Sequence, residues 1–244
     1  MKTMIVMPVA NEESTIKGLL GEIQAQLPEA RTLVVMDDFS CDRTMEIVHA
    51  ASLVAPSRVR LLYHPASTGF ASCYLYGFRQ TVAMGADYVI EMDGGGSHDP
   101  SELPRMVELL RDHDCVFSSR FSPSGGFENH PAQRRLISWA GTKAANFLLG
   151  TSLSDMTSGY EGFRIGVLRT IDRNIGFDNF LALRGAQHFF QTELRYYCRN
   201  LRCAEHPITY RGSSSTLKWA AVWRSLGALY RLGCRRPVQP EDLS

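Results

Sequence analysis

The stretch YVIEMDGGGSHDP, residues 88–100, joins a short apolar run to a carboxylate, three glycines and a segment typical of a helix start. The run Tyr88–Met92 is rich in strand-forming residues and is followed by glycines, which predicts a buried strand. The segment Asp99–Glu102 has the pattern of a capping box with proline at the first helical position. We therefore expect a strand, a glycine turn and a helix, with Asp93 at the carboxyl end of the strand and Asp99 as the helix cap.

The same order of a short apolar run and a helix-length amphipathic stretch recurs along the chain. Alternating strands and helices predict a mainly parallel sheet with helices on both faces. A chain of 244 residues is long enough for one such domain with a substantial core, so the expected fold class is single-domain α/β. The expected strands are Thr3–Val9, Leu33–Met36, Val59–Tyr63, Tyr88–Met92, Cys115–Ser118 and Cys203–Tyr210, and the later helices are Gln133–Leu149 and Ala186–Asn200.

The composition excludes several classes of protein. Lys and Arg number 26 and Asp and Glu number 25, so the net charge gives no bulk attraction to nucleic acid or to an acidic membrane. The six cysteines show no zinc-binding spacing, and the N-terminus does not have the pattern of a signal peptide. Apolar runs are all too short to span a membrane. We expect a reduced, cytoplasmic protein without a nucleic-acid partner.

Acidic residues follow several of the expected strands. They are found in Asn11-Glu12-Glu13, in Asp37-Asp38 and at Asp93. Ligands bind at the carboxyl ends of strands in sheets of this kind. One carboxylate there can accept from a ribose or base, and another can hold a cation that bridges phosphates. Any one of these acids alone fits a helix cap better, but three at one edge of a sheet favour a site for a nucleotide diphosphate.

Eight ordered blocks of sequence carry a more specific resemblance. They are MPVANEESTI, VVMDDFSCDRT, HPASTGFASCYLYGF, GADYVIEMDGGGSHDPSELPRM, SSRF, DMTSGYEGFR, FQTELRYYCRNL and EHPITYRGSSSTLK. From about Met4 to Lys218 the chain resembles the dolichol-phosphate mannose synthase group of inverting GT-A glycosyltransferases. The resemblance implies a Rossmann-like GT-A domain over residues 1–217. It also implies transfer of a hexose, mannose, from a nucleotide-diphosphate sugar, GDP-mannose, to a polyprenyl or dolichyl phosphate.

The resemblance also implies site residues by position. The residues implied in catalysis are Asp93, Arg120, Asp155, Arg211 and Lys218. The residues implied in binding the nucleotide sugar are Pro8, Ala10, Glu12, Asp38, Ser40, Asp93, Gly94, Gly95, Arg134, Arg135 and Ser214. The family often has an aromatic residue where Ala10 stands, which is a first departure from its pattern.

A second departure concerns the metal. Asp93 matches the first acid of the family's Asp-x-Asp metal motif, but Gly95 stands in the place of the second acid. Mg²⁺ or Mn²⁺ held by Asp93 alone, with phosphates and water, is one possibility, because Mg²⁺ often has only one or two carboxylate ligands. His98 is a poorer ligand for a hard cation. The other possibility is a metal-free route, in which basic side chains neutralise the diphosphate. These are Arg120, Arg134, Arg135, Arg211 and Lys218.

The segment Asp155–Tyr160 resembles the acceptor side of the family's site, although a simple turn explains Thr157 and Ser158 equally well. Transfer to a sugar hydroxyl needs a general base, whereas a lipid phosphate is already an anion. The sequence lacks the base motif of relatives that use hydroxyl acceptors, which favours a phosphate acceptor. The alternatives are a soluble glycosyltransferase with a hydroxyl acceptor and a degenerate, non-catalytic nucleotide-sugar-binding protein.

Residues 218–244 differ in composition from the rest and predict an amphipathic C-terminal helix with a tail. Its apolar face is formed by Trp219, Val222, Trp223, Leu226 and Tyr230. Such a helix suits peripheral contact with the membrane face. A helix docked on its own domain or on a partner subunit has the same pattern.

Two further predictions concern the segments around the later helices. We expect Phe189, Phe190 and Tyr196 in the core, because they lie at near-helical spacing. We expect Glu193 to hold a basic loop residue. The Gly- and Pro-rich segment Pro123–Pro131 predicts a mobile loop.

Overall fold

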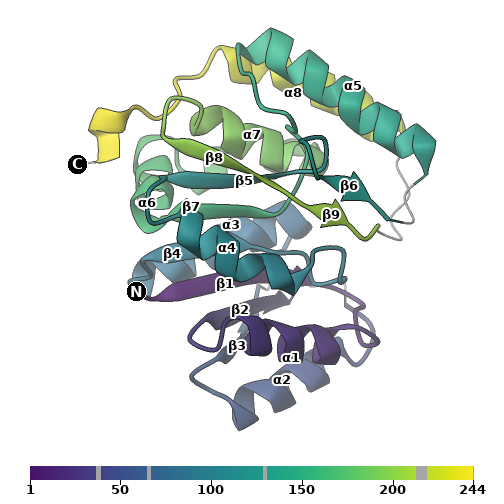
Figure 1. The fold of residues 1–244 in the computed structure, drawn as a ribbon, viewed down its shortest axis with the longest axis vertical. Coiled ribbons are helices and arrows are strands. Elements are labelled where there is room, and N and C mark those ends of the chain that lie inside the picture. Colours follow the sequence, from purple (N-terminus) through teal and green to yellow (C-terminus); the bar gives the residue numbers. More distant parts are fainter. Residues whose placement is uncertain (37–39, 65–66, 129–130, 213–218, 244) are drawn as a thin grey trace.

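The main sheet of the computed structural model is built from seven strands, and the structure describes residues 1–36, 40–64, 67–128, 131–212 and 219–243. The strand order is β3-β2-β1-β4-β7-β5-β8, and only β7 runs antiparallel to its neighbours (Figure 1). The strands are β1 (Thr3–Val9), β2 (Arg31–Met36), β3 (Val59–Tyr63), β4 (Tyr88–Glu91), β5 (Cys115–Ser119), β7 (Glu161–Arg164) and β8 (Cys203–Pro207).

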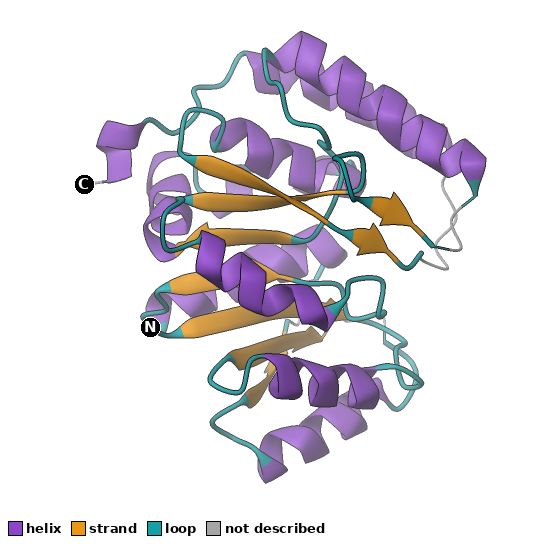
Figure 2. Cartoon of the chain, viewed as in Figure 1, coloured by secondary structure: helices purple, strands orange, loops and turns teal. Residues whose placement is uncertain are grey.

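Helices cover both faces of this sheet, as the alternation in the sequence predicts (Figure 2). In β1, Ile5 and Met7 enter a core with α1, α2 and α4, whereas Met4 and Val6 enter a core with α3, α6 and α7. The helices are α1 (Ile16–Gln26), α2 (Thr44–Val54), α3 (Phe70–Ala83), α4 (Leu103–Leu109), α5 (Ala132–Leu149), α6 (Ile165–Asn174), α7 (Phe190–Tyr197) and α8 (Trp219–Gly233). Short 3-10 helices are found at Pro100–Glu102, Phe177–Asn179, Leu181–Arg184, Gln187–Phe189 and Pro240–Leu243.

The strand expected over Cys203–Tyr210 is two strands, which corrects the prediction. Ile208 donates from its amide to the Ser119 carbonyl and accepts from the Gly126 amide, so the chain leaves the main sheet there. The following strand, β9 (Thr209–Tyr210), pairs in parallel with β6 (Gly126–Phe127). The segment Pro123–Pro131, which was predicted to be a mobile loop, therefore contains the strand β6, and β6 pairs with β9.

Strand β7 and the start of α7 are further differences from the prediction. β7 directly follows Asp155–Tyr160, the stretch expected as an acceptor segment, and it separates the parallel strands β4 and β5. Helix α7 begins at Phe190, because a 3-10 turn occupies the residues before it. Short segments like these give too little periodicity for a prediction.

The later helices bury the residues expected in the core. Phe189, Phe190 and Tyr196 are at most 2% exposed, which confirms their prediction. The Glu193 carboxylate accepts from the Leu181 and Ala182 amides and pairs with Arg235, so it does hold a basic residue.

The C-terminal helix α8 lies beside α5 (Figure 1). Leu229 and Leu232 are buried in the same core as α7, whereas Tyr230 is exposed. This part of α8 therefore docks on its own domain. The side chains of the other predicted face residues, Trp219, Val222, Trp223 and Leu226, lie outside the description. Among the described residues, no helix has both the length and the apolar character to cross a membrane.

Candidate active site

The loops that follow β1 and β2 are fastened to each other at the carboxyl edge of the sheet. The Glu12 amide donates to the Thr44 hydroxyl at 2.8 Å, and the Cys41 amide donates to the Asn11 side chain at 2.8 Å. The Asn11 amide donates to the Ser40 hydroxyl at 3.2 Å. The Ser40 hydroxyl thus joins the two loops, and any contact with a nucleotide would be additional to this role.

Glu12 and Asp42, an acid just before α2, have different hydrogen-bond partners. Asp42 accepts from the amide of Thr44, the first residue of α2, at 3.0 Å, and from the Glu13 amide at 3.0 Å. The Glu12 carboxylate accepts from the Thr15 hydroxyl, whereas the amides of Thr15 and Ile16 bond to the Glu12 carbonyl. Burial raises the pKa of Glu12, and the charges of Asp42 and Asp93 raise it further. The Glu12 side chain is therefore not a helix cap.

Asp93 lies at the end of β4 with both carboxylate oxygens oriented. Tyr74 donates to Oδ1 at 3.0 Å and Ser97 donates to Oδ2 at 3.1 Å. The Asp93 side chain is still 42% exposed, so a ligand can reach it. Sequence reasoning did not select Tyr74 or Ser97. Tyr74 reaches Asp93 from α3, which no local pattern shows, whereas the position of Ser97, four residues after Asp93, was a signal that could have been used.

The three glycines after Asp93 lie in different environments. A Cβ at Gly94 would lie 2.3 Å from Val9 Cγ1 and 2.9 Å from the Pro8 carbonyl, so β1 leaves no room for a side chain. Gly96 has φ +76°, which favours glycine. A Cβ at Gly95 would lie 2.9 Å from Glu12 Oε1. Steric and backbone demands therefore explain Gly94 and Gly96, while Gly95 is the neighbour of a carboxylate.

His98 lies beneath the same turn and stacks on Tyr160, with ring centroids 4.7 Å apart. Its Nδ1 accepts from the Asp93 amide at 3.1 Å, which places the proton of the neutral ring on Nε2. Burial lowers the pKa of His98, so the ring is neutral. Nε2 has no hydrogen-bond partner in the described part of the chain and lies 3.7 Å from Asp93 Oδ2.

Asp99 caps the helix that follows, as predicted, and also holds Arg211. Its Oδ1 accepts from the Ser101 amide at 2.9 Å, and its Oδ2 pairs with the Arg211 guanidinium. The Arg211 amide donates to the Ser97 carbonyl at 3.0 Å. These contacts bring a predicted basic residue from the end of the chain to the turn that carries Asp93.

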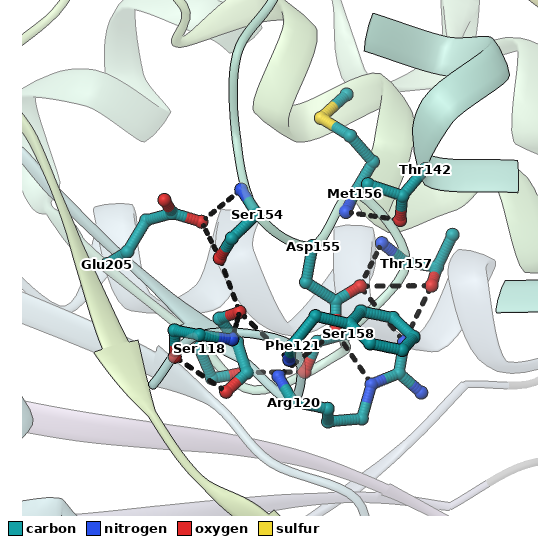
Figure 3. A network of polar contacts seen from close by, with 12 residues as sticks. Ser118, Arg120, Phe121, Thr142, Ser154, Asp155, Met156, Thr157, Ser158 and Glu205 are labelled. Atoms are coloured by element: carbon teal, nitrogen blue, oxygen red, sulfur yellow. Dashed lines mark hydrogen bonds and ion pairs between the residues drawn. The ribbon is translucent and has the colours of Figure 1, made fainter. Parts of the chain in front are cut away.

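Arg120 and Asp155 form a buried ion pair, so the structure joins two of the predicted catalytic residues to each other (Figure 3). Arg120 donates from Nε to Oδ2 at 2.7 Å and from Nη2 to Oδ1 at 3.0 Å. Burial raises the pKa of Asp155, but Arg120 and then Arg195 outweigh it and bring the pKa to about 2. Within the described residues Arg120 Nη1 has no hydrogen-bond partner, and the guanidinium lies 5.4–5.7 Å from the ring centres of Phe121, Phe127 and Tyr210.

A second buried charge network lies behind this pair and was missed at the level of sequence. Glu91 and Glu161 are paired in register across β4 and β7, and neither is exposed. Arg195 donates from Nε to Glu161 Oε1 at 2.5 Å and also bonds to the Asp155 carbonyl. Burial raises the pKa of Glu161 to about 7 and raises that of Glu91, with the neighbouring charge of Glu161 as the next cause.

The remaining predicted residues are spread around this edge. Pro8 and Ala10 are half-buried at the end of β1. Arg134 lies near enough to His188 to lower its pKa, after the larger effect of burial. The Arg135 guanidinium lies 5.7 Å from the centre of the Phe127 ring. The predicted residues outside the described part of the chain are Asp38, Ser214 and Lys218.

The side chains at the end of β4 determine whether a divalent cation can bind there. The described residues contain no cluster of three or more His, Cys, Asp or Glu side chains suited to a metal. Two carboxylates, Asp93 and Glu12, do lie at this point, with the unpartnered Nε2 of His98 beside Asp93. Mg²⁺ and Mn²⁺ sites that also use substrate phosphates need only one or two carboxylates. The residues present fit such a cation.

The doubly covered sheet and the acid-bearing strand ends agree with the GT-A class of glycosyltransferases that the sequence resembles. The model of the family described as "Glycosyl transferase family 2" matches residues 4–172, and the chain belongs to this family. The undecaprenyl-phosphate mannosyltransferase of Micrococcus luteus is 35% identical over 212 residues, 86% of this chain and 84% of the relative. The polyprenol monophosphomannose synthase of Mycolicibacterium smegmatis is 31% identical over 212 residues, 86% of this chain and 77% of the relative.

A solved structure with the same fold is the mannosyltransferase of Pyrobaculum calidifontis in complex with GDP-Man and Mn²⁺. It has a TM-score of 0.61 and 15% sequence identity, and the match covers 99% of this chain and 66% of that one. At this identity the likeness establishes the fold. The predicted fold class and the predicted class of enzyme are both confirmed.

Proposed function

We propose that this glycosyltransferase moves mannose from GDP-mannose to a polyprenyl phosphate at a membrane surface. The observation that carries the proposal is the identity of 35% and 31% with relatives named for polyprenyl-phosphate mannosyl transfer, over 86% of the chain. The oriented Asp93 carboxylate and the guanidinium groups of Arg120 and Arg211 are the parts that this reaction requires at the donor.

The state of Asp155 supports a phosphate acceptor over a hydroxyl acceptor. Its pKa is about 2 and both of its oxygens accept from Arg120, so it is a weak general base. A polyprenyl phosphate is already an anion and attacks without losing a proton. We therefore assign Asp155 to holding Arg120, rather than to removing a proton from the acceptor.

In the proposed reaction a phosphate oxygen of the lipid forms a bond to the anomeric carbon while the bond to the nucleotide diphosphate breaks. Arg120 Nη1 and the Arg211 guanidinium stabilise the negative charge that develops on the leaving diphosphate. Asp93 would hold a divalent cation, which would supply further positive charge to that diphosphate. Asp93 is held in place for donor binding by Tyr74 and Ser97.

The test is a donor screen followed by transfer. GDP should raise the melting temperature more than UDP, because ligand binding stabilises the folded state. Label from GDP-mannose should then pass into a short polyprenyl phosphate and into the organic phase. The substitution Asp93→Asn should lower kcat/KM by about 10²-fold or more, because the loss of one electrostatic contact at a transferring group has an effect of this size.

Other outcomes of this experiment would contradict the proposal. Transfer to a soluble sugar hydroxyl, with a pH profile that shows a base, would identify a hydroxyl acceptor. Binding of GDP-mannose without turnover towards polyprenyl phosphate would identify a binding protein. Full activity of Asp93→Asn would remove Asp93 from the donor site.

A further inference from the structure

Gly95 and Glu12 share one small volume at the edge of the sheet. The three atoms nearest to a Cβ built at Gly95 are Glu12 Oε1 at 2.9 Å and Glu12 Cδ and Oε2, both at 3.5 Å. They are the three atoms of one carboxylate. The Glu12 carboxylate therefore lies where a side chain at residue 95 would project, and any larger residue at 95 would displace it.

The Glu12 carboxylate has few competing contacts. Its hydrogen bond comes from the Thr15 hydroxyl to Oε2, at 3.1 Å. Oε1, the oxygen nearest to Gly95, has no hydrogen-bond partner in the described residues, and no basic side chain there pairs with Glu12. Burying part of a carboxylate without a counter-charge is unfavourable. A cation at this point would remove that cost.

Asp93 is the second carboxylate at this point and is also without an Arg or Lys partner in the described residues. The hydroxyls of Tyr74 and Ser97 orient it, as ligating carboxylates are oriented in metal sites. His98 is 1% exposed, and its unpartnered Nε2 lies 3.7 Å from Asp93 Oδ2. The buried His98 N–H group needs a hydrogen-bond acceptor. A water molecule bound to a cation at this point would be such an acceptor, and so would Asp93 Oδ2 after a small movement of the side chain.

We propose that Glu12 supplies the second carboxylate of a divalent-cation site with Asp93, in place of an acid at residue 95. This inference rests on the proposed function, because the diphosphate of the donor completes the coordination. The two acids come from the ends of the neighbouring strands β1 and β4. The site takes Mg²⁺ or Mn²⁺, which accept oxygen ligands from two carboxylates, phosphates and water.

The experiment measures Mn²⁺ binding to the whole chain by electron paramagnetic resonance, with GDP present. Glu12→Gln and Asp93→Asn should each weaken Mn²⁺ binding about tenfold or more. The control is Glu13→Gln, which makes the same change of charge at the next residue and keeps an acceptor for the Arg43 amide. Its Mn²⁺ affinity should match that of the unchanged protein.

A second variant separates loss of a ligand from damage to the loop. Gly95→Asp added to Glu12→Ala, which empties the volume beside residue 95, should restore most of the Mn²⁺ affinity that Glu12→Ala loses, because a carboxylate then returns to that volume from the other side. Unchanged Mn²⁺ binding by Glu12→Gln would overturn the proposal. An equal loss of GDP binding in EDTA would also overturn it, since Glu12 would then be a ligand of the nucleotide.

The outcome is distinguishable from that of the proposed function. If mannose passes to polyprenyl phosphate at full rate in EDTA, and neither the unchanged protein nor any variant binds Mn²⁺, the cation site is refuted while the transfer reaction stands. If Mn²⁺ binding follows Glu12 and Asp93 as expected but no transfer occurs, the cation site stands and the proposed reaction fails.

Discussion

Two buried carboxyl groups beneath the site, those of Glu91 and Glu161, have raised pKa values because of their surroundings. Glu91 and Glu161 lie opposite each other, and Arg195 pairs with Glu161. Neither carboxyl oxygen of Glu91 has a hydrogen-bond partner in the described residues. Two buried carboxylates that share one guanidinium cannot both ionise at low cost. A proton therefore remains on this pair at a pH where exposed carboxyls have lost theirs.

This pair gives the stability a pH dependence with a definite sign. A carboxyl with a raised pKa in the folded protein stabilises the fold below its unfolded pKa, and this contribution is lost as the pH rises through the folded pKa. For Glu161 the window runs from 4.5 to about 7. We compare the unfolding free energy of Glu91→Gln with that of the unchanged protein. The difference should shift in favour of Glu91→Gln by about 1 kcal/mol or more from about pH 5 to about pH 8.

Urea unfolding at the two pH values measures this difference. Glu108→Gln, which changes an exposed acid paired with Arg105, is the matched control and should leave the pH dependence unchanged. Parallel stability curves for Glu91→Gln and the unchanged protein would contradict the expected coupling of the two buried carboxyls.

Helix α5 carries several exposed large apolar side chains. Leu136, Trp139 and Phe147 are all exposed, at spacings that place them on one helical face. Lys143 lies on the same face, with its Nζ 5.9 Å from the centre of the Trp139 ring. Aromatic and basic side chains on one face suit a membrane interface. The sequence left this role open for the C-terminal helix, beside docking on its own domain, and we propose it for α5.

The proposal about α5 predicts weaker membrane binding when its aromatic residues are removed. The double variant Trp139→Ser with Phe147→Ser should bind vesicles of phosphatidylglycerol and phosphatidylcholine about tenfold or more weakly. Each large apolar side chain removed from water contributes about 1.5–3 kcal/mol. Cosedimentation measures the effect.

A matched control for the α5 variant lies on α2. Leu53 and Val54 are also exposed, and α2 lies at the far end of the molecule from α5 in Figure 1. Leu53→Ser with Val54→Ser should leave vesicle binding unchanged. An equal loss from the two double variants would mean that the α5 face has no special role.

At the scale of the whole molecule, the C-terminal segment completes the core. Leu229, Leu232 and Val238 lie in the same cluster as α3, α6 and α7. The Val238 amide donates to the Tyr197 carbonyl, and Arg235 Nη1 donates to the Tyr197 hydroxyl at 2.6 Å. The division between residues 1–217 and 218–244 stays a prediction, and we expect the first part to depend on the second.

A chain shortened to residues 1–217 tests this dependence. It loses three large buried side chains, each contributing about 1.5–3 kcal/mol, so its unfolding free energy should fall by roughly 5 kcal/mol. Chemical unfolding followed by circular dichroism measures the change. A chain that ends at residue 239 keeps these side chains and should stay close to the full chain. Equal stability of the 1–217 chain would show that the first part folds without the second.

Features that depend on neighbours along the chain could be predicted from the sequence. The strand Tyr88–Glu91, the cap at Asp99 and the two-sided cover of the sheet all follow from periodicity and from hydrogen bonds a few residues long. The ordered blocks determined the class of enzyme, and the place of Asp93 followed from the end of its strand.

The contacts between side chains at the site could not be predicted from the sequence, because they join residues that are far apart along the chain. Arg120 and Asp155 are 35 residues apart, and Glu161 and Arg195 are 34 apart. Glu12 and Gly95 meet because β1 and β4 are neighbours in the sheet although they are distant in sequence. Such contacts depend on strand order and register, and local sequence patterns carry no information about either. The sequence therefore identified a carboxylate at a strand end, and the packing of the strands decided which other charges surround it.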